Sequence, residues 1–310
     1  MASADIVVVG SLNTDLVTTV NRAPGAGETV KGHHFAIHGG GKGANQAYAA
    51  AILGGNVAMI GQVGNDSFGK EHLTSLNHVG VQTNAICVSS KYPTGTAAIT
   101  VDQQGENRIV VVPGANDHIP KDHIRQQSTL LRSSKIVMFQ LEISLDSLEE
   151  AFALLINSKP LIIMDPAPAR AFPLDWYPRI DFLTPNLTEL ATLSGRPLGE
   201  KAFKTDILEA ARELIGRGAK NVIAKLGGEG ALHIDRHLNT NVYPAPKVAV
   251  VDTTAAGDCF NGAFASRLGH GHDIEAAIQF AIKAASLSVR RSGAQPSIPT
   301  AEEVEKTTFG

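Results

Sequence analysis

The chain has 310 residues, of which 43% are hydrophobic and 18% are charged, and its formal net charge is −3. This composition is that of a globular protein, and it lacks the basic excess that a nucleic acid or an anionic membrane would require of a partner. No apolar run is long enough to span a bilayer, and the two cysteines lie too far apart for a metal motif. Because no basic leader precedes the first apolar run, we expect a cytoplasmic protein.

Short runs rich in β-branched residues alternate with segments of helical spacing along most of the chain. Strands are predicted at 6–9, 57–63, 135–140, 161–165, 182–184 and 221–226, and helices at 44–53, 68–78, 145–157, 207–217, 256–268 and 274–289. This alternation predicts an α/β fold with a largely parallel sheet and helices on both faces. Ligands of such sheets gather at the carboxyl ends of the strands.

Two regions depart from the alternation, and each reads as a pair of strands without a helix. The first covers about residues 16–35 with a turn at 24–27, and the second covers about 94–113 with a turn at 103–107. We expect them to form a small β lid, inserted into one α/β domain that spans residues 1–310.

A glycine-rich segment, GGGKGANQA at 39–47, opens the first predicted helix. Its glycines permit positive φ angles and a close approach of the backbone to a small ligand. The segment is not a Walker A sequence, because Lys-Ser or Lys-Thr does not follow four spacer residues, and it lacks the spacing of a dinucleotide fingerprint. Taken alone, it indicates only a turn.

The segment 251–263, VDTTAAGDCFNGA, places a carboxylate at the start of a helix built from small residues. The backbone N–H groups of Ala255, Ala256, Gly257 and Asp258, at the positive end of the helix dipole, would suit a phosphate. A carboxylate beside a bound phosphate makes most sense as a base that takes a proton from a hydroxyl, so the segment indicates a phosphotransferase with Asp258 as its base. The alternative is that Asp258 only occupies a favourable first-turn position.

With these two segments the chain resembles the ribokinase family of carbohydrate kinases, and the resemblance covers about residues 5 to 300. It extends in the family's order to the segments VGSLNTD at 9–15, QLE at 140–142, DPAPAR at 165–170, TPNLTE at 184–189 and SGAQPS at 292–297. The resemblance implies the α/β fold with its lid. It also implies ATP-dependent phosphorylation of D-ribose to D-ribose 5-phosphate, with Asp258 as general base and an anion hole at 255–258.

The resemblance further implies which residues bind the acceptor sugar. Carboxylates and amides suit this task, because a sugar hydroxyl both donates and accepts hydrogen bonds. Each polar residue has an ordinary explanation as a turn, solvated or helix-start residue, but together they stand at strand ends. The set comprises Asn13, Asp15, Gly40, Gly41, Lys42, Asn45, Glu142 and Asp258.

Magnesium is expected at Asn186 and Glu189, which are spaced i, i+3 at a helix start and match an Asn-x-x-Glu element of the family. Mg²⁺ keeps most of its waters and takes few carboxylates, so one amide and one carboxylate would suffice. The alternative is a capping arrangement in which Glu189 reaches back to Asn186, and both interpretations can hold together.

The nucleotide is expected beside a strand that ends in a glycine turn. Members of the family usually carry Thr where this chain has Lys225 and Asn where it has Asp165, so Lys225 either pairs with a phosphate or points to solvent. The C-terminal apolar helix at 274–289 is expected beside the adenine. The residues implied for ATP binding are Asn186, Lys225, Gly227, Gly228 and Gly230.

Two expectations rest on resemblance alone. One is a homodimer formed through the β lid. The other is a monovalent cation, K⁺, held by oxygen ligands. These are the carboxylate of Asp252, largely the backbone carbonyls of Thr254, Ser288, Arg291 and Gly293, and the hydroxyl of Ser297.

Two other functions compete with a ribose kinase. A kinase for 2-deoxyribose or for a nucleoside would use the same fold and the same base. A non-catalytic sugar or nucleotide sensor is disfavoured, because Asp258 and its small-residue turn are intact and no DNA-binding domain is appended.

Overall fold

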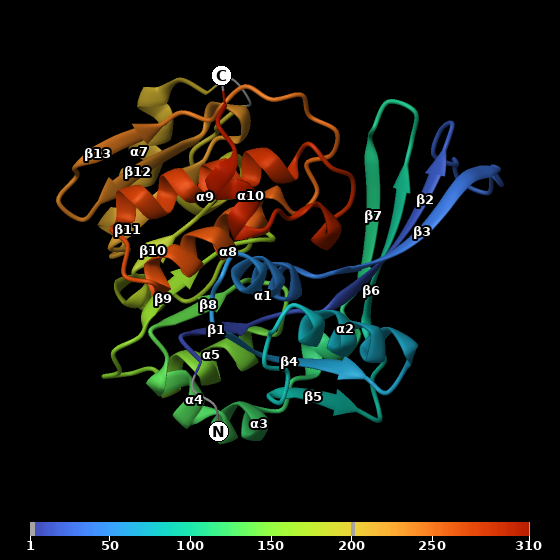
Figure 1. Cartoon of the computed structure of the whole chain (residues 1–310), viewed down its shortest axis with the longest axis horizontal. Coiled ribbons are helices and arrows are strands. Elements are labelled where there is room, and N and C mark those ends of the chain that lie inside the picture. Colours follow the sequence, from blue (N-terminus) through green and yellow to red (C-terminus); the bar gives the residue numbers. More distant parts are fainter. Residues whose placement is uncertain (1–3, 200–201, 310) are drawn as a thin grey trace.

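The structure is a computed structural model that describes residues 4–199 and 202–309, so residues 1–3, 200–201 and 310 of the predicted domain lie outside it. Its main body is built on the largely parallel sheet predicted from the sequence (Figure 1). Within the described residues this sheet has nine strands, in the spatial order β13 (Thr240–Tyr243), β12 (Ala231–Asp235), β11 (Asn221–Lys225), β10 (Phe182–Leu183), β9 (Leu161–Met164), β8 (Ile136–Phe139), β1 (Ile6–Val9), β4 (Val57–Gly64) and β5 (Ile86–Ser89).

Strand pairing is parallel from β11 across to β5, whereas β12 pairs antiparallel with both β11 and β13. All six predicted strands are present, with ends that differ by at most one residue. The sequence did not indicate β5, β12 or β13. Because β5 and β13 are short edge strands with partly exposed side chains, tertiary pairing decides them more than local propensity does.

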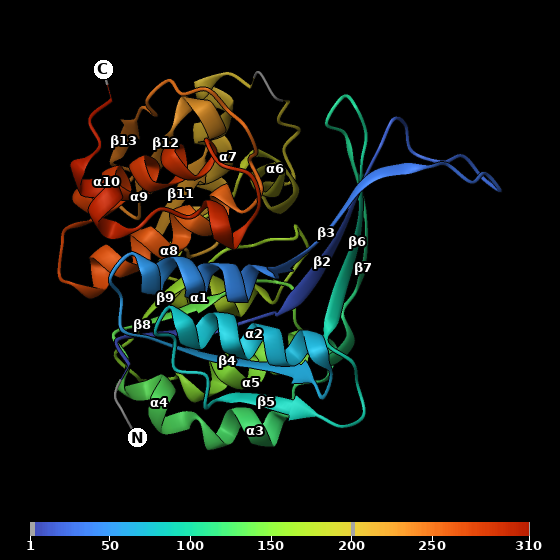
Figure 2. The same cartoon turned by 45° about the vertical axis from the view of Figure 1, so that its right-hand side comes forward.

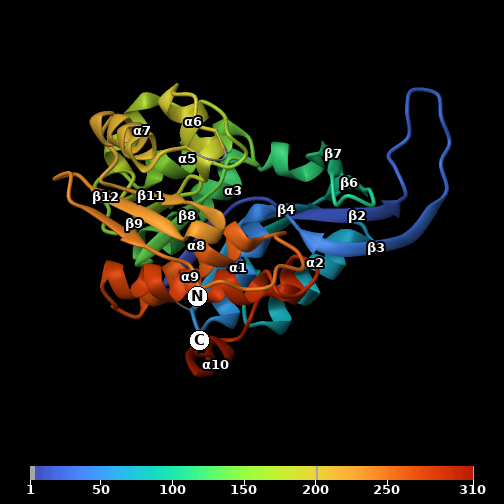
Figure 3. The same ribbon diagram turned by 90° about the horizontal axis from the view of Figure 1, so that it is seen from above.

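Helices cover both faces of the sheet, as predicted. In β1, Ile6 and Val8 pack into one core and Val7 and Val9 into the other, because successive side chains of a strand alternate. Figure 3 shows one helical layer on each side of the sheet. One layer contains α1 (Lys42–Ile52), α2 (Ser67–His78), α8 (Ala256–Gly269), α9 (Ile274–Ser288) and α10 (Ala301–Lys306), and the other contains α3 (Lys121–Gln126), α4 (Ser128–Ser133), α5 (Leu145–Leu154), α6 (Leu187–Ser194) and α7 (Lys204–Gly216). Among the described residues, every helix is too short or too polar to cross a lipid bilayer.

A second, small sheet projects from the side of the main body (Figures 1 and 2). Its spatial order is β3 (Gly32–Gly40), β2 (Asn13–Val20), β6 (Gly95–Val101) and β7 (Asn107–Val112), so both predicted strand pairs join in one sheet. The predicted limits of the first pair, 16–35, are too narrow. β2 pairs from Asn13 onward, with Gly40 of β3 on one side and Gly95 of β6 on the other, although Asn and Asp are poor strand formers on their own.

Close contact between α1 and α8 depends on a glycine. A Cβ atom on Gly262 would lie 2.5 Å from the Cβ of Ala49, 2.7 Å from the N of Ala50 and 2.8 Å from the O of Gln46. Only glycine therefore allows the two backbones to approach this closely. The contact sets Gln46 and the preceding residue of α1 beside the first turns of α8.

Substitution Gly262→Ala is expected to separate the two helices. Overpacking of a tight core costs about 1–3 kcal/mol, so the free energy of unfolding in urea should fall by that amount. Gly216→Ala is the matched control, because Gly216 ends α7 and a Cβ there meets no atom within 4 Å. An unfolding free energy for Gly262→Ala equal to that of Gly216→Ala would contradict the proposed packing constraint.

Candidate active site

Charged side chains from seven segments meet at the carboxyl-terminal edge of the main sheet. Asp165 follows β9, Glu142 follows β8, Glu189 lies on α6 after β10, and Lys225 ends β11. The starts of α1 and α8 and the base of β2 complete the cluster with Lys42, Asp258 and Asp15. The sequence predicted a binding edge here, because all parallel strands deliver their ends to one edge.

The Asp258 carboxylate is buried in the first turn of α8, where its side chain is 5% exposed. Two amides of α1 donate to it: Asn45 Nδ2 lies 3.1 Å from Oδ2, and Gln46 Nε2 lies 3.0 Å from Oδ1. Burial raises the pKa of Asp258, against the attraction of Lys42. The carboxylate is therefore held from outside its own helix, whereas a simple first-turn carboxylate would need no such partners.

The N-terminus of α8 offers unused hydrogen-bond donors beside this carboxylate. Ala255, at the N-cap, adopts the left-handed conformation with φ 58° and provides no side-chain cap. Among the hydrogen bonds of residues 4–199 and 202–309, none is donated by the backbone N–H of Gly257 or Asp258, whereas that of Ala256 reaches the O of Thr253. These free donors at a helix N-terminus can hold an anion.

The predicted sugar-binding residues Asn13 and Asp15 lie on β2 and Gly40 ends β3, so all three belong to strands of the small sheet. A Cβ on Gly40 would lie 2.4 Å from Asp15 Oδ2, so the glycine leaves room for the carboxylate. Burial, with repulsion from Glu142 and Asp258, raises the pKa of Asp15 to about 7.

The predicted glycine loop is also shorter than expected. β3 ends at Gly40 and α1 begins at Lys42, so Gly41 alone connects them. Gly41 has φ 84°, and a Cβ there would lie 2.6 Å from the N of Asn13. Because Gly41 packs against the backbone of β2, the sugar-binding candidates on β2 lie beside the start of α1.

Glu142 and Lys42 meet at the start of α1. Glu142 Oε2 accepts hydrogen bonds from Ser11 Oγ at 2.6 Å and from the backbone N of Lys42 at 2.9 Å. Burial lowers the pKa of the Lys42 ammonium, but the surrounding carboxylates, led by Asp258, outweigh burial and raise it. Lys42 is therefore a charged donor facing the cluster.

Sequence reasoning missed two buried amides that position these residues. Asn116, in a 3₁₀ turn after β7, accepts from the N of Leu12 at 2.9 Å and donates to Asn13 Oδ1 at 2.8 Å. Gln46 accepts from Gln140 Nε2 at 2.7 Å. Gln46 could have been noticed in the sequence, because it is a polar residue among the alanines of α1. Nothing in the local sequence distinguishes Asn116.

A cavity of about 520 Å³ lies beside the N-terminus of α8, which is within the size range of small-ligand sites. The glycine turn after β11 forms one wall, and apolar residues of α9 form another. Lys225 lines the cavity but does not point to solvent, because its side chain is 13% exposed and pairs with Asp165. The lining residues include Gly227, Gly228, Gly230, Ala256, Gly257, Phe260, Ile282, Ala285 and Val289.

The two residues expected at magnesium form a capping box at the start of α6. Asn186 Oδ1 accepts from the N of Glu189, and Glu189 Oε2 accepts from the N of Asn186, both at 2.8 Å. Burial raises the pKa of Glu189, against the attraction of Lys225. The capping alternative is thus present, and lone pairs of the carboxylate remain for a hydrated cation facing the same cluster.

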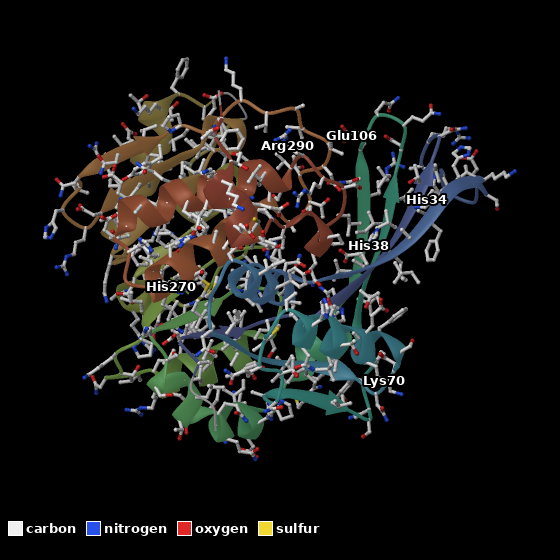
Figure 4. All side chains as sticks on the ribbon, in the orientation of Figure 1. His34, His38, Lys70, Glu106, His270 and Arg290 are labelled. Carbon is white, nitrogen blue, oxygen red and sulfur yellow. The ribbon has the colours of Figure 1, made fainter. Side chains whose placement is uncertain are left out.

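Of the segments expected to hold a monovalent cation, the one at Asp252 and Thr254 is hydrogen-bonded to the one at Gly293. Asp252 accepts from Thr254 Oγ1 at 2.6 Å and from the N of Gly293 at 2.8 Å, and these hydrogen bonds lower its pKa although burial opposes them. His38, at the base of β3 (Figure 4), contributes to this lowering. Two of the other expected oxygen ligands have partners of their own: the backbone O of Ser288 accepts from the N of Arg291 at 3.0 Å, and Ser297 Oγ donates to the O of Ala294 at 2.7 Å.

Among the described residues, no three His, Cys, Asp or Glu side chains gather as they would around a transition metal.

Comparison with known proteins gives one consistent relationship. Residues 3–301 match the family described as pfkB family carbohydrate kinase. The chain is 39% identical to the ribokinase of Bacillus subtilis over 302 residues, which cover 97% of this chain and 98% of that protein. It is 36% identical to the deoxyribokinase of Salmonella typhimurium over 304 residues, covering 96% of this chain and 97% of that protein. Its fold matches an Arabidopsis thaliana ribokinase complexed with ribose and ATP, with a TM-score of 0.89, 32% identity and coverage of 98% of both chains.

The raised pKa of Asp15 predicts a pH-dependent stability. Its folded-state pKa of about 7 exceeds the ordinary value of 3.8, so the folded chain binds the proton more tightly and its unfolding free energy falls as pH rises from about 4 to 7. Asp15→Asn should remove about 2 kcal/mol of this pH-dependent decrease in the unfolding free energy. This is less than the value that the full shift in pKa would give, because solvent screens the charge of Asp15.

Urea unfolding at several pH values measures the effect. Asp206→Asn, at an exposed position in the first turn of α7, is the control and should keep the wild-type slope. If Asp15→Asn also kept that slope between pH 4 and 8, the buried, repelled state of Asp15 would be wrong.

Proposed function

The chain belongs to the pfkB family of carbohydrate kinases, and we propose that it transfers the γ-phosphoryl group of ATP to the primary hydroxyl of D-ribose. One observation carries the proposal: the buried Asp258 carboxylate stands beside unused backbone N–H groups at the start of α8. A base and an anion site in contact are what phosphoryl transfer to an alcohol requires. The relatives named ribokinase over nearly the whole chain support ribose as the acceptor.

In the proposed reaction Asp258 accepts the proton of the sugar hydroxyl. The hydroxyl oxygen forms a bond to the γ-phosphorus while the bond from that phosphorus to the β,γ-bridging oxygen breaks, and ADP leaves. The N–H groups of Gly257 and Asp258 hold the charge that develops on the transferred group. Since burial raises the pKa of Asp258, its carboxylate is a stronger base than an exposed one.

Acceptor recognition is assigned to the polar groups at the base of the small sheet. Asp15 and Glu142 accept from sugar hydroxyls, Lys42 donates to a sugar oxygen, and Asn13 and Asn45 contribute amides. Asn116 keeps Asn13 in place through the hydrogen bond to its Oδ1. The small sheet would act as a lid over the sugar, because two of these side chains stand on β2.

The nucleotide is assigned to the cavity beside α8. Its apolar wall on α9 suits an adenine ring, and the glycine turn at Gly227 and Gly228 lets the backbone approach a phosphate. The Asn186 and Glu189 pair fits a hydrated Mg²⁺ that neutralises nucleotide phosphate charge when bound.

A monovalent cation is assigned to the Asp252 segment, where the Asp252 carboxylate joins Thr254 and Gly293 and the backbone O of Ser288 accepts from the N of Arg291. Omission of Mg²⁺ should abolish turnover, and omission of K⁺ should lower it. Unchanged rates would argue against the corresponding ion.

The small sheet also supports a homodimer. All six residues of the edge strand β7 are exposed, including Ile109, Val110, Val111 and Val112 at 51–67%. An exposed apolar edge of this kind aggregates unless a partner covers it, and a second small sheet would do so. Sedimentation of the purified chain as a monomer at micromolar concentration would contradict the dimer.

A cytoplasmic location is proposed from the thiols. Cys87 and Cys259 are both free, as expected for a reducing compartment. Cell fractionation measures the location directly.

Removing the base tests the mechanism. Asp258→Asn keeps the size of the side chain but removes its basicity, so kcat should fall about 10²–10⁴-fold while ATP affinity changes little. The urea midpoint shows whether the variant still folds. Activity within threefold of wild type, about 0.6 kcal/mol, would refute Asp258 as base, and absence of turnover in the wild type itself would favour a sensor.

Acceptor choice tests the substrate, because the relatives include both ribokinases and a deoxyribokinase. A buried acceptor left unpaired by a missing hydroxyl costs about 1–3 kcal/mol, so ribose should exceed 2-deoxyribose in kcat/KM by about tenfold or more. Asp15→Ala should shrink this ratio. ADP release measured with pentoses, hexoses and nucleosides decides the matter, and equal or better use of 2-deoxyribose would replace ribose as the proposed acceptor.

A further inference from the structure

Two positions at which this chain departs from the residues usual in its family form one ion pair. Lys225 Nζ lies 2.9 Å from Asp165 Oδ1, and the two side chains are 13% and 2% exposed. Neither charge could be buried here alone without a large cost in free energy. The two departures are therefore one joint feature of the site.

The Lys225 ammonium is shared between this pair and the nucleotide cavity. It lies 3.4 Å from the position of a Cβ on Gly257, whose backbone N–H is one of the free donors of α8. Lys225 also lines the cavity together with Gly227 and Gly228. A phosphoryl group held by the α8 donors would thus lie within reach of the ammonium.

Asp165 connects this lysine to the base. Its second oxygen, Oδ2, accepts from Gln46 Nε2 at 2.8 Å, and the same Nε2 donates to Asp258 Oδ1 at 3.0 Å. The Oε1 of Gln46 is occupied by Gln140, so the amide is held in one orientation. Lys225, Asp165, Gln46 and Asp258 form a continuous chain of contacts from the cavity to the base.

Other charges face Asp165 and do not replace Lys225 as its partner. The pKa shifts of Lys42, Asp258 and Glu189 each include an effect of Asp165. Of the ion pairs within residues 4–199 and 202–309, the one with Lys225 is the only one that Asp165 makes. Loss of Lys225 would leave the carboxylate with Gln46 as its nearest donor.

We infer that Lys225 is a catalytic residue that exchanges Asp165 for the γ-phosphoryl group of ATP, and that Asp165 is a positioning residue that orients Gln46 against the base. The inference rests on the proposed kinase function. A lysine is a compact point charge with three donors, so it can contact Asp165 in the free enzyme and a phosphate oxygen in the complex. Because Asp165 and the phosphate compete for the ammonium, we expect opposite effects from removing Lys225 and from removing the charge of Asp165.

Nucleotide affinity measured calorimetrically without sugar separates these roles, because no turnover is needed. Lys225→Met should reduce the preference for ATP over ADP by about tenfold, since the γ-phosphoryl group loses a charge-assisted contact. Asp165→Asn should raise that preference by a few-fold, because Lys225 no longer has a competing carboxylate. Lys220→Met is the matched control: Lys220 pairs with Asp181 at 2.8 Å just before the other end of β11.

Turnover of the double variant Lys225→Met/Asp165→Asn separates catalysis from structure. It carries no buried unpaired charge, so its urea midpoint should recover relative to Lys225→Met, while kcat stays at least tenfold below wild type with the KM for ribose unchanged. Recovery of kcat together with stability would overturn the inference and leave a structural ion pair. An unchanged ATP preference in Lys225→Met would do the same. Failure of the kinase proposal is distinguished by wild-type ADP release, which is measured first.

Discussion

Burial of one carboxylate, Asp258, is the constraint on which the rest of the site depends. A buried carboxylate is costly unless donors surround it, and here both donors come from α1. They reach it because α1 and α8 approach closely at Gly262. Small residues in both helices are thus a requirement of the site, and they leave the start of α8 open to an anion.

Carboxylates outnumber lysines in the site, and this imbalance contributes to the shifted pKa values of its side chains. Five carboxylates (Asp15, Glu142, Asp165, Glu189 and Asp258) share the edge of the sheet with two lysines, Lys42 and Lys225. Burial, together with repulsion from neighbouring carboxylates, raises the pKa of Asp15, Glu189 and Asp258, and the carboxylates raise that of Lys42. Phosphate groups would add more negative charge, so a lysine that can leave its carboxylate, as proposed for Lys225, has a clear electrostatic use.

The small sheet contributes to the site from its strands and not only as a cover. Its strand β2 carries Asn13 and Asp15, and the chain passes from β3 into α1 through the single residue Gly41. Movement of this sheet would therefore move the proposed acceptor-binding groups relative to Asp258. The dimer proposed at the exposed β7 edge of the same sheet would then be coupled to the proposed sugar site.

The sequence by itself determined those strands and helices that have a clear side-chain periodicity of their own. The β-branched run 6–9 and the helical spacing at 256–268 predicted β1 and α8, because side-chain periodicity alone specifies such buried elements. Resemblance and motif together predicted Asp258 and the carboxyl edge of the sheet. The tertiary structure alone decided the extension of β2 to Asn13, the role of Asn116 and the Lys225–Asp165 pair. Each of these depends on partners far away in the chain. Lys225 and Asp165 are 60 positions apart, Asn116 and Leu12 are 104 positions apart, and no local pattern records such distant contacts.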